Sequence, residues 1–232
     1  MMMYYLVVVT VVYLSIIDKL SGRSIELPQY KIVYSESDFE VRLYPECSWM
    51  SALVTLPTNS FQNSTKQGFH RLYQYIHGAN LNSTKIPISA PILTTIIINN
   101  NVNSSVQGLD YYVRLYLSTK YDKATPKPLQ DLNLKLNKWK SHCIAIRKFS
   151  GFAEDDNIDK EVESLKNSLN KSHQVLTMVD NKNSSSSGSN SYTIAQYNSS
   201  HHHSGITGRL NEVWINVVSG FTAQGCPFYQ EE

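Results

Sequence analysis

The chain has 232 residues, with 21 basic and 19 acidic side chains and a formal net charge of +2. This length suits one large domain or two small ones and is enough to bury a core. The even charge balance gives no general attraction to nucleic acid or to anionic membranes, and the sequence carries no nucleic-acid-binding signature, so we expect no nucleic-acid partner.

Residues 4–17 form an almost wholly apolar run that ends at Asp18. A membrane-spanning helix needs about 20 such residues, so the run is short for a span and fits the central part of a signal peptide. We expect residues 1–24 to be a cleaved signal peptide, with an uncertain cleavage site, rather than an anchor. The mature chain would then follow the secretory pathway to the cell exterior (the apoplast) or to a vacuole, without a stable membrane span.

The next stretch predicts strands followed by a helix. Residues 39–44 and 49–54 alternate, which is strand periodicity. Residues 61–76 read as a helix, with Ser60 as its N-cap and Gly78 as its stop. One stripe at helical spacing predicts the side that faces the core: Phe61, Thr65, Gly68, Leu72 and Ile76.

Two further strands are predicted after a linker that contains Pro87 and Pro91. They cover residues 92–98 and 111–117 and lie on either side of a polar turn. Residues 118–133 then read as a crossover loop. The order to this point is strand, helix, strand, strand.

The same order returns in the second half. Residues 143–149 alternate as a strand, and strands over 192–197 and 213–217 follow a Ser/Asn-rich loop. A helix is predicted between the strand over 143–149 and this loop, with negative charge at its start. Its one apolar face is formed by Ile158, Val162, Leu165 and Leu169. Two β-α-β-β units predict an α+β fold, with one antiparallel sheet or open barrel and both helices outside. We favour one merged sheet over two domains, because each half alone has a thin core.

The three cysteines, Cys47, Cys143 and Cys226, are too few for a disulfide scaffold, and no C-x-x-C motif is present. Cys143 falls in a predicted strand and reads as a buried small hydrophobe. A disulfide between Cys47 and Cys226 is possible in an oxidising compartment, but nothing in the sequence requires it.

Six N-x-S/T sequons provide acceptors for N-linked glycans if the chain enters the secretory pathway. They begin at Asn63, Asn82, Asn103, Asn170, Asn183 and Asn198. A chain rich in Asn and Ser also produces such triplets by chance, so they support secretion only weakly.

Five segments resemble, in order and in spacing, motifs of the SOUL heme-binding family, in its plant SOUL-type form. They are Ser35–Tyr44, Gly68–Asn80, Lys85–Ile92, Phe149–Phe152 and Gly208–Trp214. The last three resemble the family's K-I-x-M-T-A-P-V, F-S-G and G-R-x-N-E-V-W elements. The resemblance runs from about Tyr30 to Val217, which gives a SOUL-like domain over 28–218 and a tail over 219–232.

The resemblance implies a distorted antiparallel β-barrel of two β-α-β-β units, flanked by two helices. It implies that heme or another tetrapyrrole binds non-covalently in a shallow apolar groove, for carriage, buffering or sensing. It does not imply catalysis, and the sequence lacks the common hydrolase, metalloprotease, P-loop and dinucleotide-binding motifs, so we expect no enzyme. The alternative is a secreted protein-interaction or defence-type module whose groove takes another apolar ligand or a peptide. Protein partners are unknown.

The first predicted helix carries a second apolar stripe. Phe69 and Tyr73 are i, i+4 neighbours, and Phe69 is displaced by about 60° around the axis from Leu72. Polar residues border this stripe: Lys66, His70, Gln74 and His77. An apolar strip edged by a cation suits a porphyrin, which is a flat hydrophobe with two propionates. The resemblance implies that four of these residues line the groove: Lys66, Phe69, Tyr73 and Gln74. The alternative is a wide core face that lies under a loop.

The identity of an iron ligand is left open. Some SOUL proteins carry a proposed axial His at the position that is Leu43 here, and leucine cannot bind iron. His70 and His77 remain as ligands or as exposed polar residues, and binding without a protein ligand is equally allowed. The tract His201–His203 is either a further metal-binding site or a solvated loop.

The polar residues before the last predicted strand have a structural interpretation. They are Arg209, Asn211 and Glu212. We expect them to fix a turn rather than carry chemistry. Trp214 follows them, and we expect it to pack in the core before any contact with a ligand.

Overall fold

A computed structural model of the chain describes residues 25–55, 60–99, 108–172, 191–197 and 209–217, together with Cys226. Several predicted features lie outside these residues and are not tested by the structure. They are the signal peptide over 1–24, the sequons at Asn103, Asn183 and Asn198, the tract His201–His203, and the tail over 219–232 apart from Cys226.

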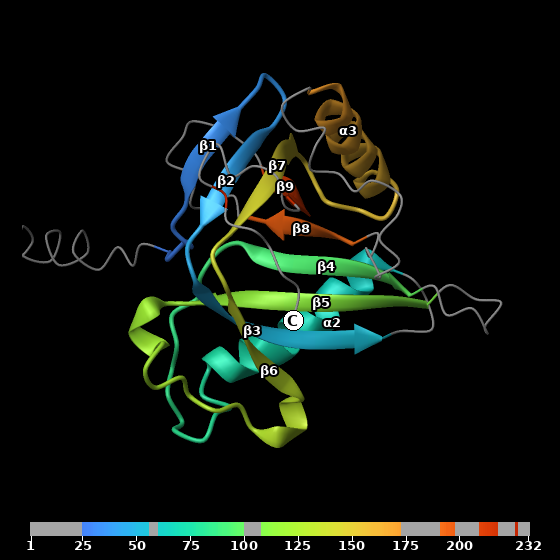
Figure 1. Cartoon of the computed structure of the whole chain (residues 1–232). Helices are drawn as coiled ribbons and strands as arrows, with labels where there is room; N and C mark the ends of the chain where they lie inside the picture. Colours follow the sequence, from blue (N-terminus) through green and yellow to red (C-terminus); the bar gives the residue numbers. More distant parts are fainter. Residues whose placement is uncertain are drawn as a thin grey trace, which may run out of the picture.

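The described residues form one sheet and two helices (Figure 1). The strands are β1 (Lys31–Ser35), β2 (Glu40–Tyr44), β3 (Cys47–Thr55), β4 (Ile92–Asn99), β5 (Gly108–Leu117), β6 (Leu134–Trp139), β7 (His142–Ser150), β8 (Tyr192–Gln196) and β9 (Leu210–Asn216). The helices are α2 (Phe61–Ile76) and α3 (Ile158–Lys171), with short 3-10 turns at η1 (Thr119–Tyr121) and η2 (Gln130–Leu132). Among the described residues no helix is both long and apolar enough to cross a membrane.

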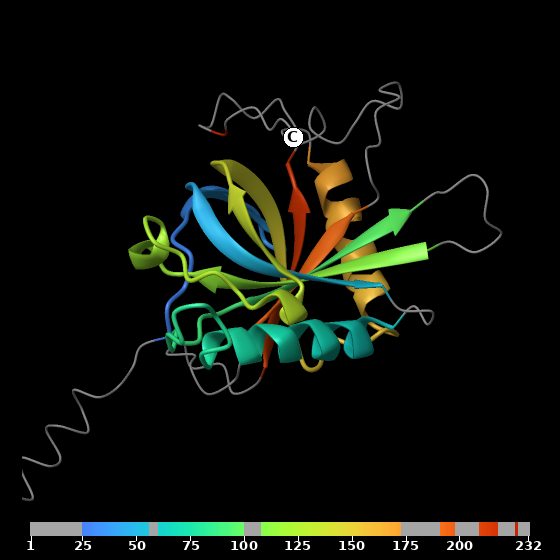
Figure 2. The same ribbon diagram turned by 90° about the horizontal axis from the view of Figure 1, so that it is seen from below.

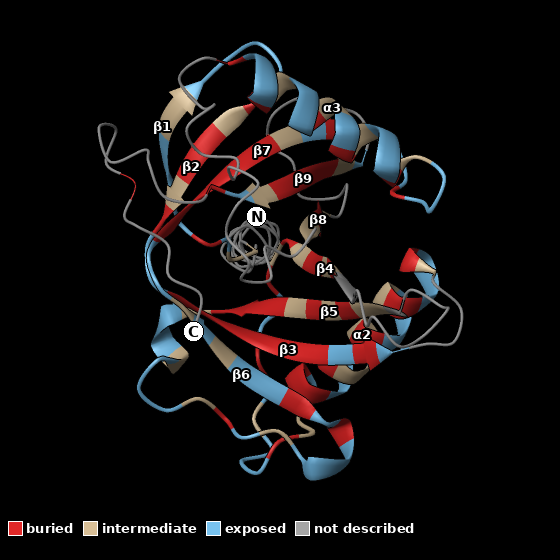
Figure 3. Cartoon of the chain, turned by 45° about the vertical axis from the view of Figure 1, so that its right-hand side comes forward, coloured by how far each residue is buried: buried red, intermediate tan, exposed pale blue. Residues whose placement is uncertain are grey.

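All nine strands join one sheet in the order β1-β2-β7-β9-β8-β4-β5-β3-β6, and every pairing is antiparallel. The units β3-α2-β4-β5 and β7-α3-β8-β9 meet where β8 pairs with β4. The sheet curls, with α2 and α3 on its outer side (Figures 2 and 3). The predicted α+β fold of two β-α-β-β units in a distorted barrel is therefore confirmed, and so is the merged sheet.

Helix α2 begins and ends where its caps predict. The Ser60 hydroxyl accepts a hydrogen bond from the Asn63 backbone N–H at 3.4 Å, and Gly78 follows the helix with a φ of 110°. Such a positive φ suits glycine, which has no Cβ. Within the helix, a Cβ at Gly68 would lie 2.4 Å from Cγ2 of Val113. Glycine at this position lets α2 approach β5 closely.

Helix α3 presents a single apolar face to the sheet. The four residues predicted for that face are all buried: Ile158, Val162, Leu165 and Leu169. On its more polar side, Glu161 accepts a hydrogen bond from Arg147 of β7 at 3.1 Å. The acidic residues Asp159 and Glu161 lie in the first turn, where the helix dipole favours negative charge.

The two faces of the sheet carry two different cores, because successive side chains of a strand point to opposite faces. The outer core includes Val113 and the buried residues of both helices. The inner core lies inside the curl and is rich in aromatic side chains, among them Tyr44, Trp49 and Trp214. Trp214 is 2% exposed, so its predicted place in the core is confirmed.

The disulfide differs from the one that the sequence left open. Cys143 pairs with Cys226, whereas Cys47 is a free, buried thiol. The reason is strand alternation: Cys47 lies on the inner face, where its sulfur accepts a hydrogen bond from Trp49 at 3.2 Å. Cys143 lies on the outer face, in the same core as Cys226. The prediction that Cys143 is buried is right, but it is not a free hydrophobe.

Candidate functional site

A groove with a volume of about 540 Å³ lies beside α2. Its walls come from six segments of the chain: the residues before β1, α2, the linker with the first residue of β4, the β7–α3 turn, the end of β8 and the start of β9. The lining residues are Ile25, Phe61, Gln62, Thr65, Lys66, Phe69, Ile88, Ser89, Ala90, Ile92, Phe152, Ala153, Glu154, Gln196, Tyr197 and Arg209. The volume falls in the range of about 300–1,000 Å³ that is typical of small-molecule sites.

The linker wall of the groove is fixed by the sheet beneath it. The Ser89 hydroxyl donates a hydrogen bond to the Tyr116 carbonyl at 2.6 Å, and the Ala90–Pro91 peptide bond is cis. The Ala90 N–H also donates to the Glu26 carbonyl at 3.0 Å. These contacts place Ile88, which is 44% exposed, beside α2 with its apolar side chain open to the groove.

The opposite wall is the β7–α3 turn. Gly151 has a φ of 92°, and its carbonyl accepts a hydrogen bond from the Asn211 side chain at 2.9 Å. The Phe152 carbonyl accepts one from Asn157 at 2.7 Å. Phe152 itself remains 59% exposed, and the Arg209 guanidinium lies 4.1 Å from its ring centre. Asn211 thus fixes a turn as predicted, but Arg209 lines the groove.

The charges of the groove lie at its edge. Lys66 and Arg209 are exposed cations, and Glu154 adds one carboxylate. Within the described residues neither Lys66 nor Arg209 has an ion-pair partner. An apolar floor with cations at its rim suits a flat hydrophobic ligand with carboxylates, because charge-assisted hydrogen bonds to carboxylates are among the strongest polar contacts.

A second, smaller pocket of about 420 Å³ continues the groove along α2. Its described lining residues are Asn63, Lys66, Gln67, Phe69, His70 and Tyr73. Lys66 and Phe69 belong to both pockets. The two pockets therefore form one strip, and the second apolar stripe that the sequence placed on this helix lies along it.

The six residues predicted to bind the cofactor are divided by the structure. Lys66 and Phe69 line both pockets, while His70 and Tyr73 line only the smaller one. Gln74 and His77 line neither pocket in the described part of the chain. His77 stacks on Tyr73 at 3.9 Å between ring centres and donates from Nδ1 to the Tyr73 carbonyl at 2.8 Å, and Gln74 lies 3.4 Å from His70 Nε2. The binding roles of all six remain predictions.

Other lining residues were missed because they come from segments that only the sheet brings together. The linker, the F-S-G-F turn and the G-R-L-N-E-V-W segment were recognised as motifs, but no pattern showed that they meet at α2. One signal was available. Phe152 and Ile88 are large apolar residues next to Gly or Pro in loops, where a purely structural loop favours polar residues.

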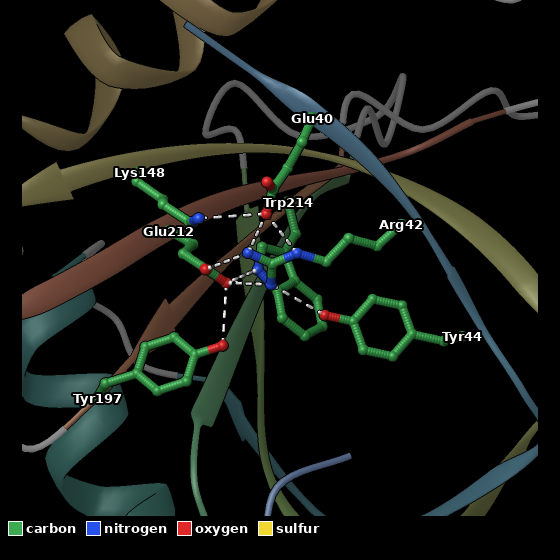
Figure 4. Close-up of polar contacts among 7 residues, drawn as sticks. All are labelled: Glu40, Arg42, Tyr44, Lys148, Tyr197, Glu212 and Trp214. Carbon is green, nitrogen blue, oxygen red and sulfur yellow. Dashed lines mark hydrogen bonds and ion pairs between the residues drawn. The ribbon is translucent and has the colours of Figure 1, made fainter. Parts of the chain in front are cut away.

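A buried network of charged and aromatic residues lies behind the groove (Figure 4). Arg42, which is 1% exposed, donates two hydrogen bonds to Glu212, at 2.8 and 3.2 Å. It also donates to Glu40 at 2.6 Å and to the Tyr44 hydroxyl at 3.2 Å. Lys148 completes the set with an ion pair to Glu40 at 3.3 Å. The charges of the two acids and the two bases balance.

Tyr197 joins this network to the groove. Its ring lines the cavity, and its hydroxyl donates to Glu212 at 2.9 Å, beside the Trp214 N–H, which donates at 2.7 Å. Burial and the Glu212 carboxylate raise the pKa of Tyr197 well above its ordinary value, so the phenol stays protonated. Burial alone disfavours the charge of Arg42, but Glu212 outweighs it and keeps the pKa of Arg42 raised. The network thus holds one wall of the groove in place.

The described residues contain no cluster of three or more His, Cys, Asp or Glu side chains that would hold a metal ion. The described walls of the larger cavity contain no imidazole or thiol. His70 is the imidazole that lies along the strip, in the smaller pocket.

Comparisons with known proteins find a matching family model and related proteins. The model of the SOUL heme-binding protein family matches residues 25–216. Heme-binding protein 2 from Homo sapiens is 23% identical over 199 residues, which cover 84% of this chain and 87% of the human protein. The Mus musculus protein of the same name is 21% identical over 167 residues, or 70% of this chain and 78% of the mouse protein.

Among solved structures, SAV2435 bound to tetraphenylphosphonium aligns with a TM-score of 0.41 and 12% identity, over 81% of this chain and 98% of that one. The two sequence relatives are mammalian, so they give no support to a plant-type assignment. Because the family match covers most of the chain, the protein belongs to the SOUL heme-binding protein family.

Proposed function

We propose that this protein binds heme or a related tetrapyrrole non-covalently in the groove along α2 and serves as a carrier, buffer or sensor of that ligand. The observation that carries the proposal is an apolar cavity of about 540 Å³ with two cations, Lys66 and Arg209, at its rim. Family membership supports a tetrapyrrole as the ligand, and the geometry of the cavity supports the groove along α2 as the binding site.

The residues of the groove fit the parts of a porphyrin. The rings of Phe69 and Phe152 provide flat apolar surface for the macrocycle. The rim cations would hold the propionates through charge-assisted hydrogen bonds. Phe152 and Ile88 are 59% and 44% exposed, and both line the groove, so a bound ligand would cover them.

If a helix residue supplies an iron ligand, His70 is favoured over His77. His70 lines the smaller pocket, whereas His77 is stacked on Tyr73 and donates from one ring nitrogen to the backbone. Heme supplies redox and ligand-binding chemistry at its iron when it is bound. The chain's own part is to hold the macrocycle, pair its propionates and shield one of its faces.

We further propose that the protein acts in the secretory pathway, outside the cell or in a vacuole. The apolar run at residues 4–17 supports this, and so does the buried Cys143–Cys226 disulfide, because disulfides persist in oxidising compartments. A second candidate function is a protein-interaction or defence-type module that uses the same groove for another apolar ligand or a peptide. The exposed rings of Phe152 and Tyr73 favour this alternative as well.

The test is a titration of the purified mature chain with heme and with protoporphyrin, read in the Soret region. Phe69→Asp places a charge in the middle of the strip, and we expect it to abolish saturable binding. The matched control is Leu81→Asp, at a residue that is 67% exposed and lines neither described pocket, and we expect it to bind like the wild type.

A His70→Ala/His77→Ala variant then separates iron coordination from packing. Loss of the heme shift with unchanged protoporphyrin binding would assign an imidazole ligand. No saturable binding of either ligand by the wild type would overturn the proposed function and leave the alternative.

A further inference from the structure

Three of the sequons begin at described residues, and the asparagine of each is exposed. Asn63 lies in the first turn of α2, Asn82 in the turn after this helix, and Asn170 in the last turn of α3. The two asparagines that are buried in the described part of the chain, Asn80 and Asn211, begin no sequon, and their side chains donate to backbone carbonyls. All three acceptors therefore meet the main requirement for a glycan, which is free access to the side-chain amide.

The position of Asn63 differs from that of the other two acceptors. It lines the smaller pocket together with His70 and Tyr73, while Asn82 and Asn170 line neither described pocket. Asn63 and His70 are seven residues apart, which is about two helical turns, so they share a helix face at a separation of about 10 Å. A group attached to Asn63 would begin at one end of the strip and extend over it.

We propose that Asn63 carries an N-linked glycan that covers the smaller pocket and limits access of the ligand to the groove. This inference rests on the proposed tetrapyrrole function and on the proposed secretory route. The transfer forms a bond between Asn63 Nδ2 and the anomeric carbon of the sugar. It breaks the bond from that carbon to the diphosphate of a lipid-linked oligosaccharide, and the amide loses one proton as the lipid diphosphate leaves.

Two physical effects give the glycan a role at this site. Tyr73 is 45% exposed and Phe69 is half-buried, so the strip is an apolar surface that would otherwise face water. A bulky polar oligosaccharide beside it keeps the protein soluble. The same bulk hinders a flat ligand from sliding along the strip beyond the larger cavity. The glycan therefore acts on ligand access, whereas glycans at Asn82 or Asn170 would not.

The test uses the full chain secreted from a eukaryotic cell line, with glycan occupancy read by peptide mass spectrometry. Asn63→Gln is compared with the matched variant Asn82→Gln, and each secreted protein is titrated with heme. We expect a glycan on the Asn63 peptide and about tenfold tighter heme binding by Asn63→Gln than by the wild type. Asn82→Gln should bind like the wild type, and trimming the wild-type glycan to its first sugar should tighten binding.

The proposal that Asn63 carries a glycan fails if the Asn63 peptide is unmodified in a protein that is glycosylated elsewhere. It also fails if the secreted protein carries no glycan at all. A glycan on Asn63 with equal heme affinity in the wild type and in Asn63→Gln overturns its effect on access. If the unglycosylated chain made in bacteria binds no tetrapyrrole, the proposed function and the access role both fail. The mass measurement still decides whether Asn63 is modified, so the two failures are distinguishable.

Discussion

Two groups of charged residues lie on either side of Tyr197, and they differ in whether their charges are matched within the chain. Behind the groove, Arg42 is buried and paired with Glu40 and Glu212. At the groove rim, the exposed cations Lys66 and Arg209 have no ion-pair partner among the described residues. An unmatched charge would be costly in the buried network, whereas water tolerates it at the exposed rim. Matched charge thus stabilises the wall behind the groove, and in the proposed function the unmatched rim cations would hold an anionic group of the ligand.

The largest expected effect on stability comes from breaking the buried ion pair between Arg42 and Glu212. Arg42→Ala leaves the Glu212 carboxylate buried without its cation, so the free energy of unfolding should fall by about 3–5 kcal/mol. Urea unfolding monitored by tryptophan fluorescence measures this. The double variant Arg42→Leu/Glu212→Gln removes both charges and keeps an acceptor for Tyr197, so it should recover much of the loss. A loss of under about 1 kcal/mol in Arg42→Ala would contradict a structural role for the network.

The second-largest loss of stability is expected from breaking the disulfide, which lies in the outer core and not at the groove rim. Cys226→Ser removes the covalent bond to Cys143 of β7 and should lower the free energy of unfolding by about 2–4 kcal/mol. The matched control is Cys47→Ser, which changes a buried sulfur that forms no disulfide and still offers an acceptor to Trp49. We expect a smaller loss in this control. Equal unfolding midpoints for Cys226→Ser and the wild type would show that the tie contributes nothing.

A smaller effect is expected at Tyr197, where the two regions meet. Tyr197→Phe keeps the ring on the groove wall but removes the hydrogen bond to Glu212, which costs about 1 kcal/mol of stability. Because the wall remains, heme affinity should change by less than about threefold. A large loss of heme affinity with unchanged stability would mean that the Tyr197 hydroxyl contacts the ligand. Tyr197 would then belong to the binding site and not to the buried network.

The smallest effect is a pH dependence on the inner face. Burial lowers the pKa of His142 from its ordinary value of 6.5, and the hydrogen bond from its ring to the Lys140 carbonyl opposes this only partly. The unfolded chain therefore binds a proton more readily, so this contribution to stability is complete above pH 6.5 and is lost as the pH falls toward the lowered pKa. His142→Gln should flatten that part of the stability profile. An unchanged slope in the variant would assign the acid sensitivity to other groups.

Much of the fold could be predicted because local signals agreed with one another. Helix α2 was located at Phe61–Ile76 from its N-cap, its stripe and its glycine stop. Strand β6 was missed, because LKLNKW alternates only weakly and follows a loop with two prolines. The sequence left open a bridge between Cys47 and Cys226, whereas Cys226 pairs with Cys143. Alternation gives the face of a cysteine within its own strand, but it does not give the partner of a cysteine that lies far away in the chain.

The site was predicted only in part for a related reason. The helix residues Lys66 and Phe69 carry a local pattern of apolar and basic side chains. Phe152 and Arg209 come from turns at the ends of other strands, and only the pairing of β7 with β9 brings them together. Long-range pairing of this kind leaves no periodic trace in a single sequence.

The most direct test of the contrast between matched and unmatched charge compares heme with its dimethyl ester, in which both propionates are blocked. Both ligands are titrated into the wild type, into Lys66→Ala/Arg209→Ala and into a similarly exposed control, Lys123→Ala/Lys127→Ala. We predict that the wild type and the control bind the free acid about tenfold more tightly than the ester, and that the rim variant binds the two equally. Equal affinity of the wild type for acid and ester would contradict the claim that the rim cations recognise the carboxylates of the ligand.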